Sequence, residues 1–207
     1  MKFNLLITGG LGYIGSFTAK NYLKKTRKKL FVVDNLSRGN FFAKKYSNNS
    51  ILDISNNKLN KIIEKKKINT IIHLASFTCV RESIRKKSKY LNNYKSQIKF
   101  INNVKKTSVK YFIFSSSLSV YEKNKYKRNL SPYSMYKLKI EKYLKTISSK
   151  NFKVIILRYP NIIGSDPSGK LGEKNDFISR IVPLFYKNLL KTKKNTLFYD
   201  YNKKIYP

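Results

Sequence analysis

Short apolar runs alternate with longer amphipathic segments along most of the chain. Near-continuous apolar runs of this length are typical of parallel strands buried on both faces, and the amphipathic segments between them are typical of crossover helices. We predict strands at 3–8, 30–34, 50–54, 70–75, 111–115 and 154–157. The predicted helices cover 13–25, 59–66, 89–106 and 132–148. This order predicts an α/β fold, a Rossmann-type doubly wound parallel sheet.

The pattern changes after residue 160. Gly164, Pro167, Gly169 and Gly172 follow within a few residues of one another, and a helical stretch is then predicted at 177–190. No internal repeat or low-complexity linker separates the two parts. We therefore predict a Rossmann domain over 1–160 and an incomplete C-terminal substrate domain over 161–207.

The composition supports a folded protein without membrane segments. Hydrophobic residues make up 41% and aromatic residues 14%, enough for a core. No apolar run reaches the roughly 18 residues of a membrane span, and the apolar run at 3–7 is too short for a signal peptide. The single cysteine, Cys79, excludes an internal disulfide. These features favour a cytoplasmic protein.

The formal net charge of +35 has two interpretations. A lysine-rich surface can neutralise nucleic-acid phosphates. Alternatively, codons rich in A and T load surface positions with lysine, asparagine, isoleucine and tyrosine. The lysines are scattered through nearly every segment and do not gather in one arm, which favours the second interpretation. We expect no specific nucleic-acid partner.

A glycine motif stands between the first predicted strand and the first predicted helix. Gly9, Gly12 and Gly15 have the positions that permit a tight turn, a close approach of the backbone to a pyrophosphate, and close packing of helix on strand. The helix N-terminus then holds phosphates. Asp34 closes the second strand, where a carboxylate binds ribose hydroxyls and repels a 2′-phosphate. These features predict NAD as the cofactor. Asp53, after the third predicted strand, is either a partner for the adenine amino group or an aspartate of a surface turn.

A tyrosine and a lysine lie one turn apart on a predicted helix. Tyr133 and Lys137 project from the same face, and a nearby ammonium lowers the pKa of a phenol and makes it a better base. The preceding strand ends in a run of serines, which can hydrogen-bond the same reacting oxygen at the sheet edge that binds ligands. We interpret His73 as structural, find no activating partner for Cys79, and find no metal-ligand cluster.

With these residues assembled, the chain resembles the UDP-glucose 4-epimerases, which are extended short-chain dehydrogenases/reductases. The matching segments are TGGLGYIGS at 8–16, DNL at 34–36, HLA at 73–75, FIFSSS at 112–117, SPY at 131–133 with Lys137, LRYPN at 157–161 and PSG at 167–169. The resemblance runs through essentially the whole chain but covers only about the first two-thirds of a typical family member.

The resemblance implies roles for particular residues. Tyr133 would be the base, Lys137 its partner and a ligand of the nicotinamide ribose, and Ser117 would orient the sugar 4-hydroxyl. Asn161 would join Ser117 and Tyr133 in binding the UDP-sugar. The NAD site would be lined by Gly9, Gly12, Tyr13, Ile14, Gly15, Asp34, Asn35, Asp53, Ile54, Ala75, Asn92, Lys137 and Tyr159. The family also implies a transient 4-keto sugar and a homodimer.

The chain departs from the family pattern at several positions. Pro160 replaces a usual phenylalanine, Thr78 a common lysine, and Lys95 a usual asparagine. The segment between Tyr121 and Tyr133 is shorter than expected. The family's C-terminal third supplies arginines that bind the nucleotide diphosphate, and this part is missing here.

Three functions remain open from the sequence. The first is epimerisation at C4 of UDP-glucose and UDP-galactose. The second is a related nucleotide-sugar epimerase or dehydratase, although dehydratases need an acidic pair beside the strand serine and residues 117–120 contain no acid. The third is a non-catalytic NAD-binding remnant or a basic binding module.

Overall fold

The structure is a computed structural model that describes residues 4–26, 28–39, 48–121 and 130–173, with a few positions beyond them. The chain divides into two compact units, Met1–Lys174 and Asn175–Pro207. In the second unit, two short strands form an antiparallel pair, β7 (Phe198–Tyr199) and β8 (Ile205–Tyr206). The helix predicted at 177–190 lies largely outside the described residues.

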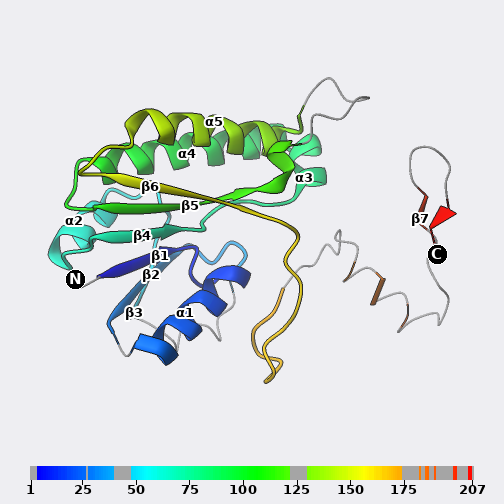
Figure 1. Cartoon of the computed structure of the whole chain (residues 1–207), viewed down its shortest axis with the longest axis horizontal. Coiled ribbons are helices and arrows are strands. Elements are labelled where there is room, and N and C mark those ends of the chain that lie inside the picture. Colours follow the sequence, from blue (N-terminus) through cyan, green and yellow to red (C-terminus); the bar gives the residue numbers. More distant parts are fainter. Residues whose placement is uncertain are drawn as a thin grey trace. The chain divides into compact units, whose positions relative to one another are not determined.

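The first unit is built on a six-stranded parallel sheet (Figure 1). Its strands are β1 (Leu5–Thr8), β2 (Leu30–Asp34), β3 (Asn48–Ile51), β4 (Thr70–His73), β5 (Tyr111–Ser117) and β6 (Lys153–Tyr159). They are arranged in the order β3-β2-β1-β4-β5-β6. The chain adds β2 and β3 on one side of β1 and β4, β5 and β6 on the other, so the strand order reverses between β1 and β4. In such folds, ligands bind in a crevice outside the carboxyl ends of the strands at this point.

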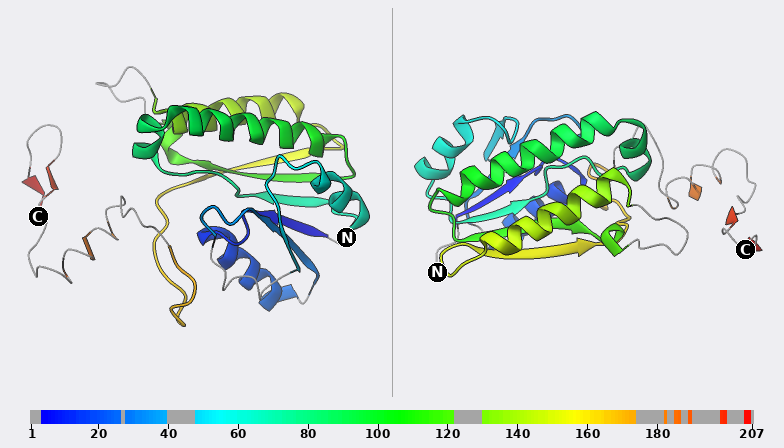
Figure 2. Two further views of the ribbon diagram at one scale, coloured as in Figure 1. Left: turned by 180° about the vertical axis from the view of Figure 1, so that it is seen from behind. Right: turned by 90° about the horizontal axis from the view of Figure 1, so that it is seen from above.

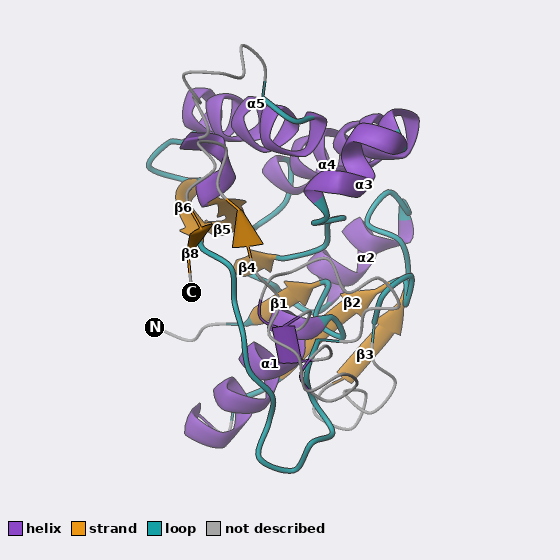
Figure 3. Ribbon diagram, turned by 90° about the vertical axis from the view of Figure 1, so that its right-hand side faces the viewer, coloured by secondary structure: helices purple, strands orange, loops and turns teal. Residues whose placement is uncertain are grey.

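Helices cover the two faces of this sheet unequally. Their bounds are α1 (Tyr13–Thr26), α2 (Lys58–Lys65), α3 (Val80–Arg85), α4 (Lys87–Lys105) and α5 (Pro132–Ile147). α4 and α5 lie side by side on one face, as the right-hand view of Figure 2 shows. α1 lies on the opposite face, below the sheet in Figure 3.

The alternation of side chains along β1 divides the core in two. Leu6 points to the face under α4 and α5, where it joins Ile71, Phe100, Phe112 and other fully buried residues. Leu5 and Ile7 point to the other face and pack with residues of α1 and β2, including Ala19 and Val32. A central parallel strand buries both faces, which explains why Leu5, Leu6 and Ile7 are apolar without a polar residue between them.

The strands and helices predicted before residue 160 are confirmed with small differences in their bounds. β3 begins earlier than expected, while β5 and β6 extend farther toward their carboxyl ends. The short helix α3 was not predicted. It is too short to show a helical period, and the Cys79 thiol caps its first turn by accepting a hydrogen bond from the Glu82 N–H.

Residues 161–173 pack against α1 within the first unit. Tyr13 Oη donates to the Gly164 carbonyl at 2.7 Å, Lys20 pairs with Asp166, and Leu171 is fully buried in the core beneath α1. The first unit thus extends past residue 160. Assignment of 161–207 to a partial substrate domain stays a prediction. No helix within the described residues is long and apolar enough to cross a membrane.

Candidate functional site

The glycine turn joins β1 to α1 with no room for side chains at two of its three motif positions. Gly9 has a φ of +67°, and a Cβ there would lie 2.6 Å from the backbone nitrogen of Ala75. A Cβ on Gly15 would lie 2.2 Å from the Gly9 carbonyl oxygen. Gly12 differs, because its nearest neighbour would be 3.2 Å away. The turn is therefore held against the end of β4, and Gly12 is its more open position.

Asp34 closes β2 directly beside this turn. Its carboxylate accepts hydrogen bonds from the Leu11 N–H at 3.0 Å and the Leu36 N–H at 2.8 Å. Burial raises the pKa of Asp34, although these backbone hydrogen bonds lower it in part. The carboxylate joins the glycine turn to the loop after β2, where the adenosine end of a dinucleotide is predicted to bind.

Two further predicted cofactor residues meet next to Asp34. The Asn35 side-chain amide donates to Asp53 at 2.8 Å. Burial would raise the pKa of Asp53, but hydrogen bonds from Ser55 and Asn35 outweigh it and leave that pKa lowered. Ile54 follows as a buried apolar residue of the main core. The structure therefore brings the loops after β2 and β3 together beside the end of β2.

Tyr133 and Lys137 are both buried on the face of α5 that packs against the sheet. The Lys137 ammonium donates to the Ser115 carbonyl at 2.7 Å and lies 6.0 Å from the centre of the Tyr133 ring. Burial lowers the pKa of Lys137 to about 7, and the charge of Glu141 opposes this in part. An ammonium so easily deprotonated can exchange a proton with a neighbouring group near neutral pH.

Ser117 ends β5, two residues after the serine whose carbonyl binds Lys137. Its hydroxyl accepts a hydrogen bond from the Ser119 N–H at 3.1 Å, which fixes the turn into the short 3₁₀ helix η2 (Leu118–Tyr121). Tyr159 is the register partner of Ser117 on β6. Burial raises the pKa of Tyr159. Asn161, two residues beyond Tyr159, is exposed.

A narrow cavity contains the Tyr133 and Lys137 side chains together with residues that follow β4. Ser76, Phe77, Tyr90 and Asn93 line it. Asn92 is exposed, whereas the adjacent Asn93 is half-buried and accepts a hydrogen bond from Gln97 at 2.9 Å. Successive residues of a helix point about 100° apart, so only one of the two asparagines can face the cavity. The structure does not bring Asn92 to the other predicted residues.

His73 is buried in β4 among aromatic rings. Its Nδ1 shares a hydrogen bond with Thr8 Oγ1 at 2.7 Å, and its ring centre is 5.0 Å from that of Phe100. Burial, aided by the positive Lys137, lowers the pKa of His73 to about 3. A neutral histidine in this setting links two neighbouring strands, which supports the structural interpretation. Among the described residues, no group of three metal-ligating side chains occurs.

Two charged clusters near the site were missed from the sequence. Glu141 on α5 binds Ser116 on β5 and Arg158 on β6. Glu82 on α3 pairs with Arg38 and with Lys89, and both cations lie over the Phe77 ring. The spacing of Tyr133, Lys137 and Glu141 along one helix face was a usable signal for the first cluster. No local pattern reveals the second, because its members come from separate segments.

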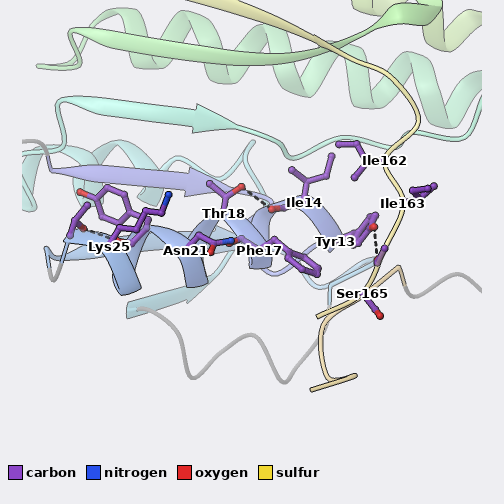
Figure 4. Close-up of a pocket in the computed structure, with 12 residues that line it drawn as sticks. Tyr13, Ile14, Phe17, Thr18, Asn21, Lys25, Ile162, Ile163 and Ser165 are labelled. Carbon is purple, nitrogen blue, oxygen red and sulfur yellow. Dashed lines mark hydrogen bonds between the residues drawn. The ribbon is translucent and has the colours of Figure 1, made fainter. Parts of the chain in front are cut away.

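A second hollow lies along the outer side of α1 (Figure 4). This groove has a volume of about 590 Å³ and is bounded by α1 and residues 162–165. Tyr13, Ile14 and Phe17 contribute much of its wall, and Ile162 and Ile163 face them from the other segment. Its lining holds none of the predicted catalytic residues, but it includes Tyr13 and Ile14, which were predicted to line the NAD site.

The sheet order and the glycine turn define a Rossmann protein of the dinucleotide-binding class. The chain belongs to the NAD dependent epimerase/dehydratase family, whose model matches residues 5–205.

Two curated relatives illustrate the similarity. A UDP-glucose 4-epimerase of Pasteurella multocida is 34% identical over 82% of this chain and 56% of its own length. A UDP-glucose 4-epimerase of Streptococcus mutans is 28% identical over 96% of this chain and 64% of its own length. The chain therefore spans between about half and two-thirds of these relatives.

Solved structures are similar over the same extent. UDP-glucose 4-epimerase from Brucella ovis in complex with NAD has a TM-score of 0.80 and 30% identity, covering 89% of this chain and 60% of that one. The Bifidobacterium longum enzyme in complex with NAD⁺ and UDP has a TM-score of 0.79 and 26% identity, covering 91% and 62%.

Proposed function

We propose that this chain is the cofactor-binding and proton-transfer part of a UDP-hexose 4-epimerase that uses tightly bound NAD. The observation that carries the proposal is the shared burial of Tyr133 and Lys137 on α5, with the Lys137 ammonium hydrogen-bonded near Ser117 at the end of β5. A phenol, an ammonium and a hydroxyl at one sheet edge suit the removal of a proton from a sugar hydroxyl. The names of the relatives support the choice of substrate class.

The glycine turn fits NAD. Gly9 has no space for a side chain because it lies against the residues that follow β4, and Gly15 has none because it lies against Gly9 and Gly10. Gly12 leaves the backbone open to a diphosphate. Asp34 would accept hydrogen bonds from the adenosine ribose, and Asn35, Asp53, Ile54, Ala75 and Tyr159 would line the remaining site. When bound, NAD supplies the hydride acceptor and donor at C4 of the sugar.

The side chains of this chain would handle the proton. Tyr133 Oη would take the proton of the sugar 4-hydroxyl as a 4-keto sugar forms, and would return it after the sugar has turned over. Lys137 would stabilise the phenolate form of Tyr133 by its positive charge. Ser117 would donate or accept a hydrogen bond at the same sugar oxygen and hold it in line with Tyr133.

The proposal also includes a substrate contact, the cellular location and the oligomeric state. Asn161 would contact the diphosphate of the UDP-sugar, and the active protein would be a cytoplasmic homodimer. A second candidate function is NAD binding without turnover.

Purified protein separates these functions. We expect NAD to remain with the protein through gel filtration and to be released on denaturation, and UDP-galactose to be converted to UDP-glucose. Bound NAD without conversion supports the second candidate function. Absence of both would refute the proposal.

The variant Tyr133→Phe tests the assigned base. It removes one hydroxyl, so we expect turnover to fall below detection while the bound NAD per chain stays unchanged. Coupled spectrophotometric assay of UDP-glucose formation and quantification of released NAD measure the two properties. Full activity in this variant would exclude Tyr133 as the base.

A further inference from the structure

A buried carboxylate lies directly behind the Tyr133–Lys137 pair. Glu141 on α5 is 1% exposed. Arg158 Nε donates to one of its oxygens at 3.0 Å, and Arg158 Nη2 donates to the other at 2.6 Å. The Ser116 hydroxyl donates to the first oxygen as well. The carboxylate is therefore bound from two strands at once.

Each member of this cluster is adjacent to a residue proposed for the reaction. Glu141 lies one helical turn after Lys137 on the same face of α5. Ser116 precedes Ser117 on β5, and Arg158 precedes Tyr159 on β6. Ser116 and Arg158 are also register partners, so their side chains leave the sheet together. The cluster thus connects all three elements that carry the proposed site.

Stability alone does not account for a charged cluster at this point. Removing a carboxylate from water is costly, and apolar residues of similar volume often give equal or greater stability than a buried ion pair. The charged pair also fixes orientation, because a bidentate interaction between an arginine and a carboxylate sets the relative orientation of the two groups. Here it fixes the rotation of α5 about its axis against β5 and β6.

We propose that Glu141 is the positioning residue of this site: its bonds to Ser116 and Arg158 fix the rotation of α5 that places the Lys137 ammonium at the Ser115 carbonyl, and its negative charge lies one helical turn from that ammonium. The proposal rests on the proposed function only for its effect on turnover. The orientation and the charge of Lys137 are properties of the chain itself, and they can be measured whether or not the sugar is converted.

The charges around Lys137 set the sign of the effect. On α5, Tyr133 and Glu141 lie one turn to either side of it. It shares a cavity lining with Tyr90 of α4, and its charge acts on the neutral His73 of β4. Among these groups Glu141 alone is negatively charged, and its charge raises the pKa of Lys137 against the effect of burial. Its removal would leave the effect of burial on the Lys137 ammonium unopposed.

The test is Glu141→Gln, which keeps the shape and the acceptor oxygen for arginine but loses the charge. Titration of Lys137 is read on the protein as purified, by trace acetylation with acetic anhydride at a series of pH values and mass spectrometry of the Lys137 peptide. We expect the midpoint to fall by about one pH unit from its position near 7. Glu64→Gln, the same change at an exposed glutamate on α2, is the matched control and should leave the midpoint in place.

A second variant covers the case in which Glu141→Gln does not fold. Arg158→Lys keeps both charges but replaces the two-point bond by a single one. We expect its kcat to fall about tenfold while KM for UDP-galactose changes less than about twofold, because orientation and not binding is affected.

The outcomes are separable. An unchanged Lys137 midpoint in folded Glu141→Gln protein, or an unchanged kcat in Arg158→Lys, overturns the role of Glu141. A wild-type protein that holds NAD but converts no sugar refutes the proposed function instead, and a lowered Lys137 midpoint in Glu141→Gln would still support the electrostatic role.

Discussion

Replacing Gly15 by alanine adds a single methyl group at the most crowded point of the glycine turn. The new Cβ would lie 2.2 Å from the Gly9 carbonyl oxygen and 2.6 Å from the Gly10 Cα. An ordinary carbon–oxygen contact is roughly 3.3 Å, so helix and turn must separate by about 1 Å. The turn cannot yield, because the Gly9 N–H is bonded to the Val33 carbonyl at 2.7 Å.

The energy of this separation can be bounded. Overpacking a close-packed core costs about 1–3 kcal/mol, and alanine returns up to about 1 kcal/mol through its higher helix propensity. Gly15 begins the part of α1 that carries the buried Ala19, so movement of the helix also loosens the core under it. We expect a net loss of about 2 kcal/mol in the free energy of unfolding, which for a domain of this size lowers Tm by roughly 4–8 °C.

Gly12→Ala is the matched control for the same chemical change. Its Cβ would meet nothing closer than 3.2 Å, so Tm should fall by less than about 2 °C, while the methyl group occupies space proposed for the diphosphate of NAD. Thermal unfolding followed by circular dichroism measures the first effect, and calorimetric titration with NAD the second. The reasoning is refuted if Gly15→Ala unfolds at the wild-type temperature, or if Gly12→Ala loses more stability than Gly15→Ala.

Three further variants test the charges of the site. Lys137→Met should abolish turnover but unfold at a higher urea concentration than wild type at pH 7 and below. The pKa of Lys137 is about 7 in the fold against an ordinary value of 10.5, so this stability advantage should shrink from pH 7 to pH 10.5 and be lost above pH 10.5. Equal urea midpoints at pH 6 would contradict the buried charge. Arg158→Met leaves the Glu141 carboxylate without its main partner, so the urea midpoint of the variant should be lower than that of wild type at pH 7. Since the pKa of Glu141 is depressed in the fold, this difference in stability should shrink as the pH falls below about 4.5. A difference that does not change with pH would contradict its assignment to the Glu141 charge. Asp34→Ser removes the carboxylate that accepts the Leu11 and Leu36 N–H groups and that would repel a 2′-phosphate. NAD affinity should therefore fall about tenfold, and NADP binding should become measurable by calorimetry. If NADP still does not bind, another group excludes it.

The fold could be predicted from the sequence because the strands are buried on both faces. Apolar runs such as 30–34 and 70–75 are too short for core helices and too apolar for surface loops, which leaves a buried strand. A strand, a glycine turn and a helix in immediate succession then define the start of a Rossmann fold. α3 escaped prediction because its six residues are too few for a helical period, and because a thiol is an uncommon cap.

The proposed site was predictable only where a local pattern carried it. Tyr133 and Lys137 are one turn apart on one helix, so their proximity follows from helix geometry alone. The spacing of Glu141 from Lys137 places both on one face of the helix, but Arg158 belongs to a different element, and no local pattern pairs it with Glu141. Asn92 and Asn93 differ by one step of the helix, and the rotational phase of α4 depends on packing that the local sequence does not determine.

The last strand of the sheet has a further consequence for how the chain behaves in solution. On the face of β6 turned away from α5, Ile155 is 47% exposed and Leu157 39% exposed. β6 also stands at the edge of the six-stranded sheet, where backbone groups are open to pairing. An apolar edge strand promotes association between molecules, whereas a net charge of +35 keeps them apart over a distance set by the ionic strength. The positive charge of the lysines thereby opposes self-association, strongly in dilute buffer and weakly in concentrated salt.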